Sequence, residues 1–196
     1  MIRIAVVGDI GSGKSYVAKL FGYPVFNADA EVAKLYKKDK GCYKKLKKIL
    51  PDYIKSFPVK KNKISEAVID NTKNLKKIIN IIHPKIRSRM NNFIQKNKSK
   101  KFVVLDIPLL IENKINKKKD IIIFVDGKKK EIRKRLKKRY GSKVEIIKKL
   151  KKFQLTVERK KKYSHFSVKN NFRHDSTKKN VKRILKKILL NARSNT

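Results

Sequence analysis

The sequence opens with Ile2-Arg3-Ile4-Ala5-Val6-Val7, and Gly8-Asp9-Ile10-Gly11-Ser12-Gly13-Lys14-Ser15 follows directly. The first run is rich in β-branched residues, which predicts a short buried strand, and the residues from Tyr16 to Phe21 are compatible with a helix. The second run, hereafter the P-loop, matches the pattern G-x-x-x-x-G-K-[ST] in the strand–loop–helix setting that gives this pattern its meaning. The sequence therefore predicts a phosphate-binding loop after the first strand.

Each part of the P-loop has a separate task in binding a nucleoside triphosphate. Its glycines allow backbone conformations that a Cβ would forbid, so that successive N–H groups can point at a phosphate. The helix that starts near Lys14 adds its unpaired N–H groups and the positive end of its dipole. Lys14 is expected to reach the β- and γ-phosphates of ATP, and the Ser15 hydroxyl to bind Mg²⁺. The expected ATP contacts in this segment are Gly8, Gly11, Ser12, Gly13, Lys14 and Ser15. A chance glycine turn is the alternative.

The composition indicates a folded chain in a reducing compartment. Of 196 residues, 40% are hydrophobic and recur at regular spacings, so we expect one domain with a small substrate-covering subdomain. The single cysteine, Cys42, excludes an internal disulfide and is expected to be a small buried residue. We find no signal-peptide pattern and no apolar window long enough for a membrane span, so we expect a cytoplasmic protein with no membrane partner. A monomer is the default expectation, although the sequence does not set the oligomeric state.

The net charge of +41, from 56 Lys and Arg against 15 Asp and Glu, raises the hypothesis of a nucleic-acid partner. However, residues 1–33 sum to zero, and the excess lies in Lys-Lys pairs between apolar positions, as on solvated helix faces. The abundance of Lys, Asn and Ile fits a genome biased toward A and T. We therefore expect non-specific polyanion binding at most. A basic nucleic-acid-binding protein that retains a P-loop is the alternative from another functional class.

The apolar runs along the chain predict an α/β fold. Strands are predicted at 2–7, 25–26, 102–105, 121–125 and 166–168. Because helical patterns separate them, we expect a five-stranded parallel sheet. Asp29, Asp106 and Asn170 each follow a predicted strand. Ligands collect at the carboxyl ends of parallel strands, so these residues are expected to converge near the P-loop.

Capping residues and prolines predict where several helices begin. Asp29 is expected to cap a helix that runs from residue 30 to about residue 38. Pro84 is expected in the first turn of another helix, where its missing N–H costs nothing. Ser176 or Thr177 is expected to cap the last helix.

Phosphoryl transfer to a hydroxyl requires neutralised phosphates and a carboxylate that accepts the hydroxyl proton. Asp29 is the best candidate for this base, and its alternative role is that of the helix cap alone. Asp106 is either a Walker-B-like carboxylate that acts on Mg²⁺ through water or a simple strand-end residue. For His83, a structural role beside Pro84 is favoured over a functional one.

A cationic cover over the phosphates is the second requirement. Arg135 and Arg139 are spaced i, i+4 in a helix predicted over 129–140, so they share one helix face. The planar guanidinium suits phosphate oxygens better than an ammonium does. Gly141 is a candidate hinge into a further helix expected over 144–155. The alternative is that these arginines are ordinary solvated surface residues.

Several motifs, taken in chain order, resemble the dephospho-coenzyme A kinase family over nearly the whole sequence. The P-loop resembles the family's G-G-I-G-S-G-K-S, and the other matching segments are Asn27-Ala28-Asp29 (D-A-D), Ile82-His83-Pro84 (L-H-P), Ile107-Pro108-Leu109-Leu110-Ile111-Glu112 (V-P-L-L-[FV]-E) and Arg135-Leu136-Lys137-Lys138-Arg139 (R-L-x-x-R). Gln154 and Asn170 resemble the glutamine and the asparagine of a C-terminal motif. The I-P-L-L-I-E and H-P elements make the resemblance specific, because the P-loop is common to many kinases.

The resemblance implies ATP- and Mg²⁺-dependent phosphorylation of the ribose 3′-hydroxyl of dephospho-coenzyme A, the last step of coenzyme A synthesis. It implies that Asp29 is the base, that Arg139 contacts the transferring phosphates, and that Asn170 lies near the adenine of ATP. It further implies a P-loop kinase fold with a core of 1–29, 99–139 and 156–196, a helical coenzyme A-covering subdomain of 30–98 and a lid of 140–155. The implied acceptor-side residues are Asp29, His83, Asp106, Pro108 and Leu109.

Several positions depart from the family pattern. Asp9 replaces a loop glycine, and Tyr16 replaces a threonine, although the Tyr16 N–H can still serve the α-phosphate. The other departures are Asn27 for the first aspartate, Tyr140 after the lid arginine, Ser164-His165 for A-D, and Lys160 or Lys161 for an arginine. A small-metabolite or nucleoside kinase on the same scaffold is the alternative within kinases, and the I-P-L-L-I-E segment argues against it.

Overall fold

The computed structural model describes residues 1–141, 147 and 150–193 of the chain. The chain forms two compact units. The first, called the sheet unit below, comprises Met1–Phe26 and Asn97–Thr196, and the second, called the helical unit, comprises Asn27–Lys96.

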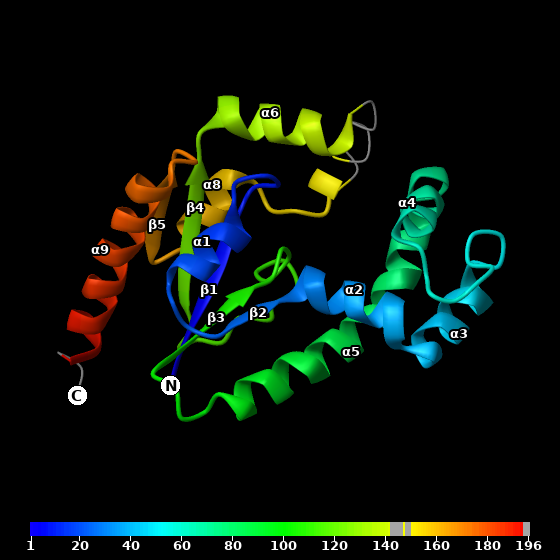
Figure 1. The fold of residues 1–196 in the computed structure, drawn as a ribbon, viewed down its shortest axis with the longest axis horizontal. Helices are drawn as coiled ribbons and strands as arrows, with labels where there is room; N and C mark the ends of the chain where they lie inside the picture. The colour runs from blue at the N-terminus through cyan, green and yellow to red at the C-terminus, as the bar shows by residue number, and fades with distance from the viewer. Residues whose placement is uncertain (142–146, 148–149, 194–196) are drawn as a thin grey trace. The chain divides into compact units, whose positions relative to one another are not determined.

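The sheet has five strands in the order β2-β3-β1-β4-β5 (Figure 1). Their bounds are β1 Ile2–Gly8, β2 Val25–Asn27, β3 Phe102–Asp106, β4 Ile121–Gly127 and β5 Phe166–Asn170. The pairs β1–β3, β1–β4 and β4–β5 are parallel. The predicted α/β class and all five predicted strands are confirmed, and each strand runs one or two residues further than predicted.

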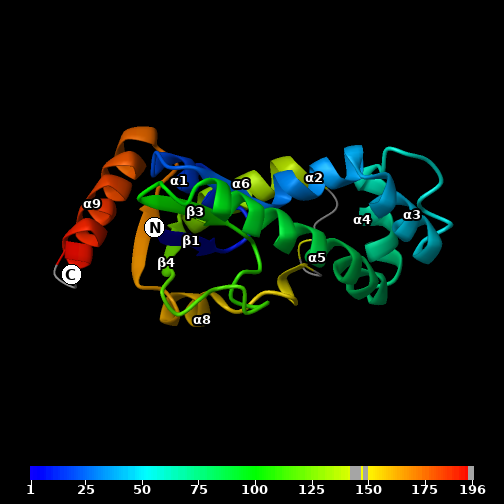
Figure 2. The same cartoon turned by 90° about the horizontal axis from the view of Figure 1, so that it is seen from below.

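Helices cover both faces of the sheet. Helices α1 (Lys14–Leu20) and α9 (His174–Arg193) pack on one face, where Val17 and Val181 join Ile4 and Val6 of β1 in the core. Helix α8 (Val157–Lys162) lies on the opposite face (Figure 2). Burying each large aliphatic side chain of this core stabilises the fold by about 1.5–3 kcal/mol. The central strand β1 is therefore held rigidly on both sides, and the P-loop continues directly from its end.

The helical unit has its own core. Its helices are α2 Ala28–Lys38, α3 Lys40–Ile49, α4 Lys61–Asp70 and α5 Lys73–Lys96. Leu35, Leu46 and Ile78 are among the buried residues that the helices share. Cys42 is fully buried in the same cluster, as predicted for a small buried residue.

Two predicted helix starts in this unit are wrong. Asn27, rather than Asp29, caps α2, because its side chain accepts a hydrogen bond from the Ala30 N–H at 2.7 Å. Pro84 lies inside α5 instead of starting a helix. A proline inside a helix costs about 3 kcal/mol. The buried stripe of Ile78, Ile82 and Met90 continues past it, and the packing of that stripe outweighs the lost hydrogen bond.

The last helix also begins earlier than predicted. Helix α9 starts at His174, so Ser176 and Thr177 lie in its first turn and do not cap it. Instead, the Asn171 side chain accepts from the Arg173 N–H, and the Thr177 hydroxyl donates to Asn170. Helix α6 (Lys129–Tyr140) matches its prediction. Of the helix expected over 144–155, residues 144–146 and 148–149 lie outside the described residues. Ile147, Leu150 and Lys151 are helical, whereas residues 152–155 are not, so the expected helix end at residue 155 is wrong. Within the described part of the chain, no helix has the length and apolarity that crossing a membrane requires.

Candidate active site

The P-loop bends tightly between β1 and α1. Gly13 precedes α1 with φ of 88°, a left-handed conformation that favours glycine, and a Cβ there would collide with the side-chain amide of Asn170. The Ser12 N–H donates to the Asp9 carbonyl at 3.2 Å, and the Val17 N–H donates to the Gly13 carbonyl at 3.0 Å. The loop geometry thus depends on glycine at position 13 and on Asn170 beside it.

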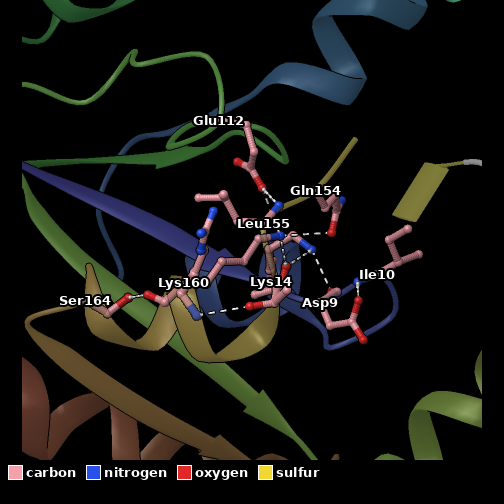
Figure 3. A network of polar contacts seen from close by, with 11 residues as sticks. Asp9, Ile10, Lys14, Glu112, Gln154, Leu155, Lys160 and Ser164 are labelled. Carbon is pink, nitrogen blue, oxygen red and sulfur yellow. Dashed lines mark hydrogen bonds and ion pairs between the residues drawn. The ribbon is translucent and has the colours of Figure 1, made fainter. Parts of the chain in front are cut away.

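The Lys14 ammonium lies along the P-loop backbone (Figure 3). Its Nζ donates to the Asp9 carbonyl at 2.9 Å and to the Gly8 carbonyl at 3.3 Å. Ser15 follows it in the first turn of α1, and its side chain is exposed. The two residues expected to hold the β- and γ-phosphates and Mg²⁺ are therefore adjacent at the start of the helix.

Asp9, which departs from the resembled loop pattern, has its charge partly neutralised. Its Oδ1 accepts from the Ile10 N–H at 2.7 Å, and its Oδ2 lies 3.4 Å from the Nζ of Lys151. This ion pair ties the P-loop to the segment that precedes α8. The negative charge of Asp9 is therefore partly balanced by Lys151, which comes from another part of the sheet unit.

Asn170, the last residue of β5, locks the P-loop from the side. It is 1% exposed, and its Nδ2 donates to the Ser12 carbonyl at 2.8 Å. Its Oδ1 accepts from the Phe172 N–H and from the Thr177 hydroxyl, both at 3.0 Å. The expected convergence of Asn170 on the P-loop is confirmed, whereas a contact with adenine stays a prediction.

Asp106 ends β3 beside the strand that leads into the P-loop. It is 2% exposed and stands in register with Val6 of the neighbouring β1. Pro108 and Leu109 follow in a half-buried turn. Among the residues that the structure describes, no group of three or more His, Cys, Asp or Glu side chains could hold a metal ion.

Helix α6 packs over the P-loop. A Cβ at Gly11 would come within 3.3 Å of side-chain atoms of Leu136 and Ile132, so this helix approaches the loop backbone closely. The Arg135 guanidinium lies over the Phe172 ring, 4.5 Å from its centroid. Arg139 belongs to the last turn of the helix, and its side chain lies outside the described part of the structure.

Phe172 has no counterpart among the predicted site residues. Its φ is 64°, a conformation that is costly for a bulky side chain. Asn170 stabilises this turn through the Phe172 N–H. Two residues later, His174 Nδ1 lies 2.7 Å from the hydroxyl of Tyr16. The contact between Tyr16 and His174 has no sequence signal, because these two residues are far apart along the chain.

A buried lysine lies beneath the P-loop. Lys160 is 1% exposed, and its Nζ contacts Gln154 Oε1 at 2.9 Å, Glu112 Oε1 at 3.2 Å and the Gly8 carbonyl at 3.3 Å (Figure 3). By contrast, the exposed Lys161 pairs with Asp126 at 3.2 Å. Three consecutive lysines in the sequence give no indication of which one is buried. Only the position of α8 on the sheet distinguishes Lys160 from its neighbours.

Two predicted site residues belong to the helical unit. Asp29 lies in the first turn of α2. His83 lies on α5, where burial and, to a lesser extent, the nearby Arg87 hold its pKa below the ordinary value. A cavity of about 650 Å³ runs along this face of α5, lined by Ile79, Asn80, His83, Pro84, Arg87, Ser88, Asn91 and Asn92.

Comparisons with known proteins agree with this geometry. A family model described as dephospho-CoA kinase matches residues 2–176. A dephospho-CoA kinase of Wolbachia sp. subsp. Brugia malayi is 30% identical over 96% of this chain and 99% of its own length. Another, from Wolbachia pipientis wMel, is 32% identical over 96% of this chain and 98% of its own length. A crystal structure from Thermus thermophilus covers 97% of both chains with a TM-score of 0.77 at 26% identity. The chain that carries this P-loop therefore belongs to the dephospho-CoA kinase family.

Proposed function

We propose that the protein transfers the γ-phosphoryl group of ATP to the ribose 3′-hydroxyl of dephospho-CoA. Its family is that of dephospho-CoA kinases, for which ATP is the phosphoryl donor. The observation that carries the proposal is the P-loop itself, fixed by the bond from Asn170 to the Ser12 carbonyl, with Lys14 at the start of α1. Such a loop supplies backbone N–H groups and a helix N-terminus to phosphate oxygens.

On the donor side, Lys14 would neutralise the β- and γ-phosphates. The Ser15 hydroxyl and the Asp106 carboxylate offer hard oxygen ligands, the type that Mg²⁺ prefers, and Mg²⁺ commonly keeps waters and binds substrate phosphates. When bound, the ion would neutralise charge that develops during phosphoryl transfer. Gly8, Gly11, Ser12 and Gly13 would supply the backbone cradle, and Tyr16 would add its N–H.

Arg135 and Arg139 are the proposed cationic cover, because α6 packs on the P-loop at Gly11. Charge neutralisation by arginine stabilises the transferring phosphoryl group. The proposed lid, residues 140–155, continues from this helix, and Asn170 would lie near the adenine.

On the acceptor side, Asp29 is the proposed general base for the 3′-hydroxyl. His83 is one of the α5 residues that line the cavity. Together with Pro108 and Leu109, it is proposed to contact the acceptor substrate. The helical unit would therefore carry most of the acceptor recognition, in keeping with the coenzyme A-covering role proposed for residues 30–98.

A coupled assay with ATP, Mg²⁺ and dephospho-CoA tests the proposal. Removing a general base costs about 10²–10⁴ in kcat, so Asp29→Asn should lose activity on that scale while remaining folded. Asp52→Asn, at an exposed aspartate of the same unit, is the matched control and should keep full activity. The proposal fails if folded protein does not turn over dephospho-CoA, if Asp29→Asn keeps full activity, or if a nucleoside or other small metabolite is the better acceptor.

The proposal also includes a cytoplasmic monomer. The buried free thiol of Cys42 suits a reducing compartment, where thiols stay reduced. Light scattering of the purified protein would contradict the monomer if it gave about twice the mass of one chain.

A further inference from the structure

Lys160 is unusual because its charged end is buried with the P-loop. Its side chain is 2% exposed, and a buried ammonium is unfavourable unless its donors are satisfied. Two acceptors, Gln154 Oε1 and the Gly8 carbonyl, receive hydrogen bonds from its Nζ, and Glu112 Oε1 forms an ion pair with it at 3.2 Å. The Lys160 backbone is fixed as well, because its N–H donates to the Thr156 carbonyl and its carbonyl accepts from the Ser164 hydroxyl.

The acceptors of Lys160 come from three separate segments of the sheet unit. Gly8 ends β1 and begins the P-loop, Glu112 follows β3, and Gln154 precedes α8. Glu112 is itself held in place, because its Oε1 also accepts from the Leu155 N–H at 2.9 Å. Hydrogen bonds and ion pairs are strong in the low-dielectric interior, so a buried polar network restrains the segments that it joins. The network therefore fixes the first carbonyl of the P-loop relative to the other two segments.

The Gly8 carbonyl is also where Lys160 meets Lys14. Both ammonium groups donate to this oxygen at 3.3 Å. Lys14 is half-buried on the loop, whereas Glu112 and Gln154 hold Lys160 in the interior. If Lys14 moves to the phosphates, Lys160 still satisfies the carbonyl that Lys14 releases. The charge of Lys160 also repels the Lys14 ammonium, which favours that move.

We propose that Lys160 is a positioning residue for the ATP site: its buried ammonium fixes the Gly8 carbonyl and thereby directs Lys14 toward the triphosphate. The inference rests on one part of the proposed function, which is that ATP binds to the P-loop. Lys160 does not touch the substrate in this role. It acts through the loop backbone and through Lys14.

The test compares Lys160→Met, Lys160→Arg and Lys161→Met by urea unfolding and by separate calorimetric titrations with Mg²⁺–ATP and with dephospho-CoA. Lys160→Met keeps the length of the side chain without its charge, and we expect ATP affinity to fall roughly tenfold or more while dephospho-CoA affinity stays within about twofold. Lys160→Arg keeps the charge and the donors, and it should retain ATP affinity within about threefold. Lys161→Met, at the exposed neighbour, should change neither affinity.

The outcomes separate positioning from a purely structural role. The proposal is overturned if folded Lys160→Met binds ATP as the wild type does, or if both affinities fall equally. If Lys160→Met does not fold, Gln154→Leu removes the shortest contact to the ammonium and should give the same selective loss, about threefold for ATP. An unchanged ATP affinity in that variant also overturns the proposal. Absence of dephospho-CoA phosphorylation by the wild type would refute the proposed function, whereas the ATP titrations would still decide the role of Lys160.

Discussion

The guanidinium of Arg135 stacks on the ring of Phe172, with 4.5 Å between the guanidinium carbon and the ring centroid. The contact joins α6 to the turn between β5 and α9, beside Asn170 and the P-loop. It holds an arginine proposed to contact ATP against an aromatic residue in a left-handed backbone conformation. Strain of this kind persists where the surrounding structure enforces it, and it is concentrated at functional sites.

Replacing Phe172 by glycine should separate stability from ATP binding. Glycine adopts the φ of 64° without strain, so we expect the free energy of unfolding to stay constant or rise by up to about 1 kcal/mol. ATP affinity should fall by about twofold to fivefold, because an exposed cation–π contact of about 0.5–1 kcal/mol no longer orients Arg135. Urea unfolding and ATP titration measure the two effects. An ATP affinity equal to that of the wild type would show that the stacking has no role in binding.

Gly13→Ala should be far more harmful than Gly22→Ala. Both glycines have a left-handed φ, 88° and 73°, but a Cβ at Gly22 meets nothing within 4 Å, whereas one at Gly13 collides with Asn170. Gly22→Ala should therefore cost only the conformational penalty, about 1–2 kcal/mol. Gly13→Ala should cost more than this in urea unfolding and should abolish ATP binding. Equal costs at the two positions would mean that Asn170 moves away freely and does not lock the loop.

Asp9→Asn should strengthen ATP binding. Asparagine can keep the side-chain oxygen that accepts from the Ile10 N–H, and it removes a negative charge close to the proposed phosphate site. We expect the KM for ATP to fall by about twofold to fivefold at low salt, with a smaller change at high salt because ions screen exposed charges. Steady-state kinetics at two ionic strengths measure this. A higher KM would show instead that the pair of Asp9 with Lys151 is needed to shape the loop.

The stability of the helical unit should depend on pH through Asp39. A hydrogen bond from Lys85 at 2.8 Å, and then one from the Cys42 N–H, hold the pKa of the Asp39 carboxyl below its ordinary value of 3.8. A pKa that is lower in the folded state means that the carboxylate stabilises the fold above the unfolded pKa. This contribution is lost as the pH falls through the folded pKa.

Asp39→Asn isolates that contribution, because asparagine can still cap α3. We expect the variant to be less stable than the wild type by up to about 1 kcal/mol at pH 7, since the pair with Lys85 is partly exposed. The difference should shrink toward zero as the pH drops below 3.8 in urea unfolding measurements. A difference that stays constant from pH 7 to pH 3 would contradict the assigned ion pair.

Local patterns in the sequence were sufficient for much of the fold. The strand before the P-loop, the apolar runs that became β3 and β4, and the helix of residues 129–140 were all predicted, because burial on both strand faces or one helix face leaves a periodic signal. The errors lie at helix ends: two starts in the helical unit, the start of α9, and residues 152–155, which are not helical. At Pro84, the packing of a longer apolar stripe outweighed the preference of proline for a helix start. At residues 27–29, a competing cap residue took the place of the predicted one.

By itself, the sequence determined the phosphate-binding loop, the parallel α/β class and the family resemblance, because these depend on residues that are adjacent or regularly spaced along the chain. Only the tertiary structure decided that Asn170 bonds to the Ser12 carbonyl, that Phe172 underlies Arg135, and that Lys160 rather than Lys161 is buried below Gly8. These contacts join residues from different strands and helices. Such pairs meet only when the sheet and its covering helices bury their common core, so no local pattern encodes them.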